Sequence, residues 1–242
     1  FPPVPDDAPH EQIHEILARY MDDQVIVYGD ANEFRAALER LPCCAMGEDG
    51  TTSGDPMNMV LVGELDDIGA VLVRRGFRRD AIDSDTAQRL FGRLPDIVAR
   101  KGGQGGVPAN WLRLWLAPLR FRGQPVFLVQ AGRPVGGRFA VGEGKDLVLH
   151  ADVDEARNLV IQDLLYSGGL AKLGFVDGVG VATLAQPRQS LAGTSYYTDG
   201  LRAVLFLATR PLEISDVQIL DWVSYLDYRA AATSEEKASE PQ

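Results

Sequence analysis

Two stretches of the chain repeat the same order of apolar and polar positions. In each, four apolar residues, Val25–Tyr28 or Met59–Val62, precede a glycine, an acid and an amphipathic segment. Such an apolar run is typical of a buried strand, and the acid suits the first turn of a helix, where carboxylates meet the positive end of the helix dipole. The repeat predicts two strand-glycine-helix units and a layered α/β architecture.

Two further helices are predicted from their capping residues. Asp152 and Glu155 form a capping-box pair before an apolar series, and Gly168 supplies the stop. Ser215 begins a second helix, which the apolar spacing extends to about Tyr228.

Two hairpins are predicted from turn residues between apolar runs. One joins residues 111–115 to 126–129 through a turn near Arg122-Gly123. The other joins residues 196–198 to 203–207 through Asp199-Gly200, a typical two-residue turn.

These elements predict an α/β fold of mixed α+β character, in which helices flank a layered sheet. Residues 42–56 are rich in glycine, serine and threonine and predict an exposed loop. We expect residues 1–53 to form a helix and the first strand-helix unit, packed on a main domain at 54–232. Residues 233–242 are expected to be a disordered tail.

Charge is segregated along the 242 residues, which carry a net charge of −10. Residues 70–140 hold 13 basic and 4 acidic residues, whereas both flanking segments are acidic. The overall acidity disfavours nucleic acid as a partner, and the basic middle could attract a smaller anion if folding gathers its charges. The apolar runs are too short for a membrane-spanning helix.

Metal chemistry has little support in the sequence. His10–His14 spells the zinc-binding pattern HExxH, but its position on an N-terminal surface helix lacks the sheet and further ligands of a zinc site, so no metal and no cofactor are expected. Cys43 and Cys44 are adjacent, and we expect two thiols in preference to a disulfide between neighbours.

Two groups of residues are candidates for chemistry. His150 with Asp154 could supply an acid and a base, although Asp154 is also placed to complement a helix dipole. Arg93, Arg113 and Arg157, with Asp96, could bind an anion, because the guanidinium fork matches phosphate and carboxylate. The same arginines could instead form structural ion pairs with Asp96 or Asp154.

Short motifs in one order resemble the family named for the C-terminal region of LssY, across residues 54–207. The residues that carry this resemblance are Gly54–Asn58, Val60–Gly63, Phe91–Arg93 with Asp96, Leu112–Trp115, Gly123–Val126, Val153-Asp154 with Arg157, and Thr198–Gly200. The resemblance implies a bacterial domain associated with membrane proteins. Where members of the family are rich in histidine, this chain has Trp111 and Leu147-Val148, so groups for proton transfer are depleted.

Two functions follow as expectations. The first is a non-catalytic accessory domain that binds a phosphate-bearing anion or lipid head group through the arginines, beside a membrane protein partner. It would lie outside the cytoplasm or be held at a membrane by a segment that precedes Phe1. The second is a hydrolase of a phosphorylated or acyl lipid-like substrate, which uses His150 and Asp154.

Overall fold

The computed structural model describes residues 15–80, 88–102, 108–133 and 150–223. Its elements, in chain order, are η1 (Asp22–Gln24), β1 (Ile26–Tyr28), α2 (Ala31–Glu39), β2 (Cys44–Met46), β3 (Ser53–Pro56), β4 (Met59–Val62), α3 (Leu65–Arg74), β5 (Phe77–Asp80), β6 (Ile97–Gly102), β7 (Pro108–Phe121), β8 (Gln124–Gly132), α4 (Val153–Ser167), β9 (Leu170–Asp177), β10 (Arg188–Gln189), β11 (Ser195–Tyr196), β12 (Leu201–Leu207), η4 (Ile214–Asp216) and β13 (Gln218–Ile219).

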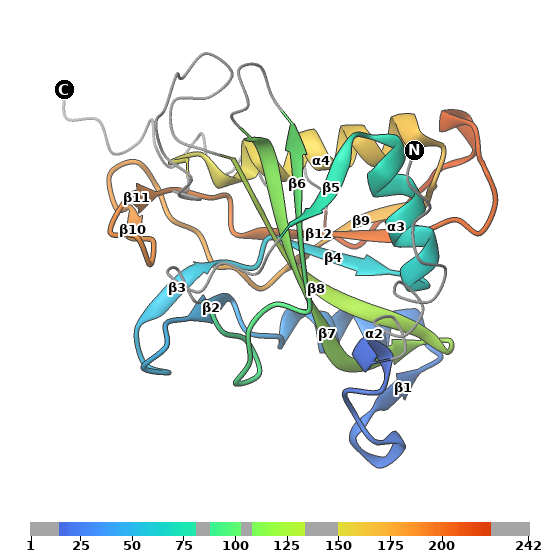
Figure 1. Ribbon diagram of the computed structural model, residues 1–242, viewed down its shortest axis with the longest axis horizontal. Helices are drawn as coiled ribbons and strands as arrows, with labels where there is room; N and C mark the ends of the chain where they lie inside the picture. The colour runs from blue at the N-terminus through green and yellow to red at the C-terminus, as the bar shows by residue number, and fades with distance from the viewer. Residues whose placement is uncertain (1–14, 81–87, 103–107, 134–149, 224–242) are drawn as a thin grey trace, which may run out of the picture.

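A twisted mixed sheet forms the middle layer of an α/β fold (Figure 1). Within the described residues it has nine strands in the order β13-β9-β12-β4-β8-β7-β6-β5, with β1 paired to β7. Helices α3 and α4 cover one face, and α2 covers the other (Figure 1). Alternate residues of each strand point to opposite faces, so the sheet supplies one side of two separate apolar cores. This layered α/β architecture confirms the predicted fold class.

Both strand-glycine-helix units are present, but only the second strand is buried. All four residues of β4 are buried between β12 and β8. In contrast, Ile26 and Val27 of β1 are 56% and 62% exposed, so the prediction of a buried strand there is wrong. The reason is topological, because β1 pairs only with the end of β7 and lies outside the main strand order.

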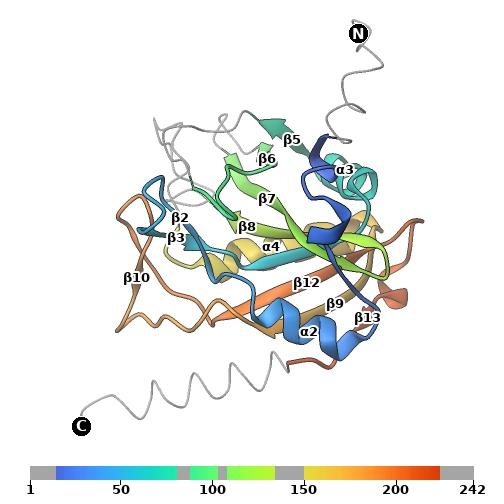
Figure 2. The same cartoon turned by 90° about the horizontal axis from the view of Figure 1, so that it is seen from below.

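The helix after Asp152 is confirmed, and the helix predicted over 215–228 is wrong. The Asp152 carboxylate accepts hydrogen bonds from the amides of Asp154 and Glu155, and Gly168 ends α4 with a φ of 72°. Residues 218–219 instead form β13, which adds a parallel strand to the edge of β9 (Figure 2). Pairing with this open sheet edge outweighs the local capping signal, and residues 224–228 lie outside the described part of the chain.

The hairpin at Arg122-Gly123 is confirmed, and the one at Asp199-Gly200 is wrong. Arg122 and Gly123 have φ values of 50° and 86°, the left-handed pair that a two-residue hairpin turn requires. At the second turn, β12 has both edges occupied, by β4 and by β9. No edge is left for the preceding residues, and β11 pairs with β10.

Residues 42–56 do not form an exposed loop. They contain β2 and β3, an antiparallel pair in which Ala45 and Asp55 are buried. The boundary expected after residue 53 therefore falls inside β3, and α2 shares one core with β4, β7 and β12. Cys43 and Cys44 are joined by a disulfide, which corrects the expectation of two thiols. The tail at 233–242 lies outside the described residues.

Candidate functional site

Arg93 and Asp96 bind the backbone of β7 at Leu116. The Asp96 carboxylate accepts from the amide of Leu116 at 2.7 Å, and the Arg93 guanidinium donates to the carbonyl of the same residue at 2.6 Å. The two side chains also bind each other, at 2.9 Å. Leu116 pairs with Phe127 of β8 on one side, and because the pairing of β6 with β7 stops at Ile97 and Leu114, this ion pair takes the place of a strand partner on the other side.

Arg157 is enclosed by acids of the same chain. Its side chain is fully buried, and it donates to both carboxylate oxygens of Asp199 at 2.9 and 2.8 Å and to the carbonyl of Leu201. Asp154 lies 3.3 Å from the same guanidinium. The ion pairs of Arg93 with Asp96 and of Arg157 with Asp154, which the sequence left as the structural alternative, are both present.

Arg113 ends a buried chain of polar side chains. Its guanidinium donates to the Gln130 amide oxygen, the Gln130 amide nitrogen donates to Gln88 at 2.8 Å, and Gln88 donates to the Asp55 carboxylate at 2.5 Å. Burial raises the pKa of Asp55, against the opposing effect of the Gln88 hydrogen bond. Two neutral amide side chains thus connect a guanidinium and a carboxylate that are both buried.

The three arginines therefore do not form one anion site. Arg157 is anchored beside β12, whereas Arg93 and Arg113 act at β7, and β4 and β8 separate those strands in the sheet. Three steps across a sheet correspond to about 14 Å.

His150 and Asp154 do not form an acid-base pair either. The His150 Nδ1 atom accepts from the amide of Asp152 at 3.1 Å. Asp154 accepts from the Thr198 hydroxyl and the Asp199 amide on its two oxygens, and within the described part of the chain no hydrogen bond joins it to His150. Burial raises the Asp154 pKa to about 6, against the lowering effect of Arg157. His10 and His14 lie outside the described residues, so the absence of zinc there stays a prediction.

An open cleft lies between α3 and the sheet edge formed by β5 and β6. It has a volume of about 350 Å³, within the range of ligand pockets. Gly69 and Ala70 of α3 contribute little or no side chain, so the space beside them stays unfilled. Its walls are mostly apolar, and they include Ile16, Ile68, Leu72, Phe77, Ile97 and Leu114.

Basic residues lie on the β5 side of this cleft and at the end of α3. Arg78 and Arg79 of β5 line it and are exposed, and Arg74 is exposed on the last turn of α3. Arg75, the fourth member of this run, is bound to Asp163. Asp66 also lines the cleft, but it stands eight residues before Arg74, about 12 Å away along the helix.

This site was not among the predicted ones, although the sequence contains a signal for it. Four arginines stand within residues 74–79, around Gly76 and Phe77, inside the segment with the strongest positive charge. Their proximity in sequence ensures that they stay together in the fold, whereas Arg93, Arg113 and Arg157 are far apart in sequence. The apolar cleft itself has no signal in the sequence, because it depends on how α3 packs against the sheet edge.

Comparison of the chain with family models, with curated proteins and with solved structures finds no match in any of the three. The resemblance to the C-terminal region of LssY therefore stays a prediction. Among the described residues, no helix is long and apolar enough to cross a bilayer.

Proposed function

We propose that this protein is a binding domain for a single-chain anionic amphiphile, an acyl chain that ends in a carboxylate or a phosphate. The α3–β5 cleft is the binding site. The observation that carries the proposal is the combination of an apolar cleft of about 350 Å³ with two exposed arginines of β5 in its lining. Such a ligand would place its chain along the apolar walls and its head group beside Arg78 and Arg79.

The chemistry of the walls supports an acyl chain in particular. Ile68, Phe77 and Leu114 line the cleft and are almost fully buried, and Val73, which also lines it, is 66% exposed. Each methylene group of a ligand that is buried against such apolar walls gains about 0.8 kcal/mol. The resemblance to the C-terminal region of LssY implies an accessory role beside bacterial membrane proteins. We include this role in the proposal, because a ligand of this kind agrees with it.

Replacement of Gly69 tests the site directly. Gly69 lines the cleft, and no atom lies within 4 Å of the position that its Cβ would take. Gly69→Leu should therefore occupy the cleft without a clash and, since glycine is a poor helix former, without loss of stability. Calorimetric titration with oleate, below its critical micelle concentration, is expected to show at least a tenfold weaker affinity in this variant.

The matched control is Gly29→Leu, at an exposed glycine that also has open space around it and lies outside the cleft. It should bind oleate like the wild type. Equal affinity in both variants, with unchanged melting temperatures, would mean that the amphiphile does not occupy this cleft. A wild type that binds no oleate, lysophosphatidate or monoolein would end the proposal.

The head group is tested by comparing ligands. Oleate and lysophosphatidate carry a charge and monoolein does not, so the charged pair should bind at least tenfold more tightly. The double variant Arg78→Gln/Arg79→Gln should remove this preference while binding to monoolein is retained. Arg40→Gln/Arg210→Gln, which removes two exposed arginines outside the cleft lining, should leave it intact. If Arg78→Gln/Arg79→Gln still binds the charged ligands more tightly than monoolein, the assignment of the head group to these arginines is contradicted.

A further inference from the structure

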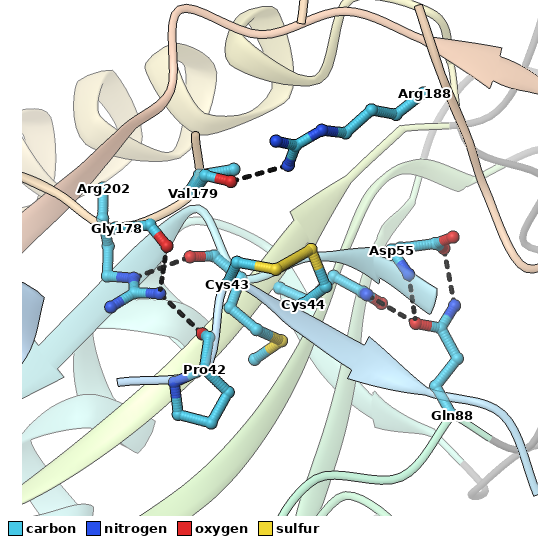
Figure 3. Close-up of a disulfide and its surroundings, with 11 residues drawn as sticks. Pro42, Cys43, Cys44, Asp55, Gln88, Gly178, Val179, Arg188 and Arg202 are labelled. Atoms are coloured by element: carbon cyan, nitrogen blue, oxygen red, sulfur yellow. Dashed lines mark hydrogen bonds between the residues drawn. A yellow bond between two sulfur atoms is a disulfide. The ribbon is translucent and has the colours of Figure 1, made fainter. Parts of the chain in front are cut away.

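The disulfide between Cys43 and Cys44 stands at the surface, where α2 is connected to β2 (Figure 3). Cys43 is exposed, whereas Cys44 is only 6% exposed and pairs with Pro56 at the start of β2. The two residues of the disulfide therefore differ in exposure, and we expect a reagent in solution to attack at Cys43.

Hydrogen bonds that involve no sulfur hold the backbone on both sides of the pair. The Met57 amide donates to the carbonyl of Cys43 at 2.8 Å. The Arg202 guanidinium donates to the carbonyl of Pro42 at 2.7 Å and to that of Gly178 (Figure 3). It also donates to the carbonyls of Leu38 and Met57. Opening the disulfide breaks none of these bonds, so the fold around it does not depend on the S–S bond.

Arg202 places a positive charge next to Pro42, and no carboxylate of the described residues pairs with it. The Arg202 side chain is fully buried, and within the described residues its hydrogen-bond partners are all backbone carbonyls. Burial lowers the Arg202 pKa to about 10, so the group stays positive at neutral pH. The guanidinium binds the carbonyl of Pro42, the residue before Cys43, and a cation near a cysteine favours its thiolate form.

We propose that Cys43–Cys44 is a reversible thiol-disulfide exchange site for low-molecular-weight thiols, attacked at the Cys43 sulfur. The incoming thiolate forms a bond to Cys43 Sγ, and the bond between the two protein sulfurs breaks, which leaves Cys44 as a thiolate that takes up a proton. A second small thiol then attacks the external sulfur of the mixed disulfide and releases the thiol of Cys43. The protein disulfide gains two electrons and two protons, and the two small thiols become one small disulfide.

Trapping of thiols in the native protein tests the proposal. The full chain is incubated with reduced glutathione without denaturant, quenched with acid, alkylated with iodoacetamide and mapped by mass spectrometry. Without glutathione, no alkylation of Cys43 or Cys44 is expected; with glutathione, both should be alkylated, and removal of glutathione under oxygen should restore the unreactive form. Two alkylated cysteines before any reductant is added, or reduction only in urea, would overturn the proposal.

The order of attack is tested with single substitutions. Cys44→Ser leaves the exposed cysteine, which should form a mixed disulfide with oxidised glutathione; Cys43→Ser leaves the buried one, which should react at least tenfold more slowly. Hydrogen exchange at the Met57 amide reports on the fold. We expect this amide to be protected whether the disulfide is oxidised or reduced, because its hydrogen bond goes to the backbone carbonyl of Cys43 and involves no sulfur atom. Equal rates in the two variants would contradict the assignment of attack to Cys43.

Discussion

Arg157 and Asp199 meet inside the protein in a bidentate ion pair, in which Nη1 donates to Oδ1 at 2.9 Å and Nη2 donates to Oδ2 at 2.8 Å. The pair joins α4 to the start of β12, because Arg157 also donates to the carbonyl of Leu201. A guanidinium that is fully buried and held in this way contributes to stability and is closed to an external anion.

Arg157→Met is therefore expected to destabilise the fold by about 3–5 kcal/mol, because it leaves two carboxylates buried without their cation. Arg157→Lys should also be costly, since an ammonium group cannot reproduce the bidentate geometry. The double variant Arg157→Met/Asp199→Asn should recover part of the loss. Urea unfolding measures all three, and a change below about 1 kcal/mol in Arg157→Met would refute this role.

Asp154 is expected to make stability depend on pH in an unusual direction. Burial raises its pKa in the folded protein to about 6 from the ordinary value of 3.8, so the folded state holds a proton on this group more tightly than the unfolded chain does. Its contribution to stability is greatest below about pH 4 and is lost as the pH rises through 6. A carboxylate whose pKa is lowered in the folded protein has the opposite effect, because its contribution to stability is lost as the pH falls.

The measurement is the difference in unfolding free energy between the wild type and Asp154→Asn from pH 4 to pH 7. Asparagine carries no titrating proton, so the stability of the wild type relative to the variant should fall as the pH rises. A difference that stays constant across this range, or that grows, would show that the pKa of Asp154 is not raised.

Gly132 should tolerate no side chain. A Cβ at this position would lie closer than 3.0 Å to the indole ring of Trp111, which is itself fully buried. Gly132→Ala is expected to lower the unfolding free energy by about 1–3 kcal/mol, as overpacked cores do. Gly102→Ala is the matched control, because Gly102 also ends a strand but has nothing within 4 Å, and its effect should stay within about 0.5 kcal/mol.

Gly69→Ala should stabilise the protein in the absence of any ligand. Gly69 stands inside α3, where alanine is favoured over glycine by about 0.5–1 kcal/mol, and its added methyl group meets no atom. Thermal unfolding of the ligand-free protein measures the gain. A lower melting temperature would show that the backbone at Gly69 depends on glycine for a reason other than space.

The sequence by itself determined those elements whose signals are local. Asp152 and Gly168 bracket α4 because a cap is a contact between residues a few positions apart. The turn at Arg122-Gly123 is determined in the same way, by a backbone conformation that two residues adopt. The apolar run at Met59–Val62 predicts a strand, but the same kind of run at Val25–Tyr28 forms an exposed strand, so the run alone does not determine burial.

Only the tertiary structure decided where distant segments meet. Residues 218–219 became a strand because β9 presents an open edge, and Asp199-Gly200 closes no hairpin because both edges of β12 are occupied. The candidate arginines are separated for a related reason: each binds a side chain or a backbone carbonyl where its own element packs, and such partners are set by strand order. Local interactions are encoded within a few residues, whereas the α3–β5 cleft and the partners of buried charges depend on the packing of the whole sheet.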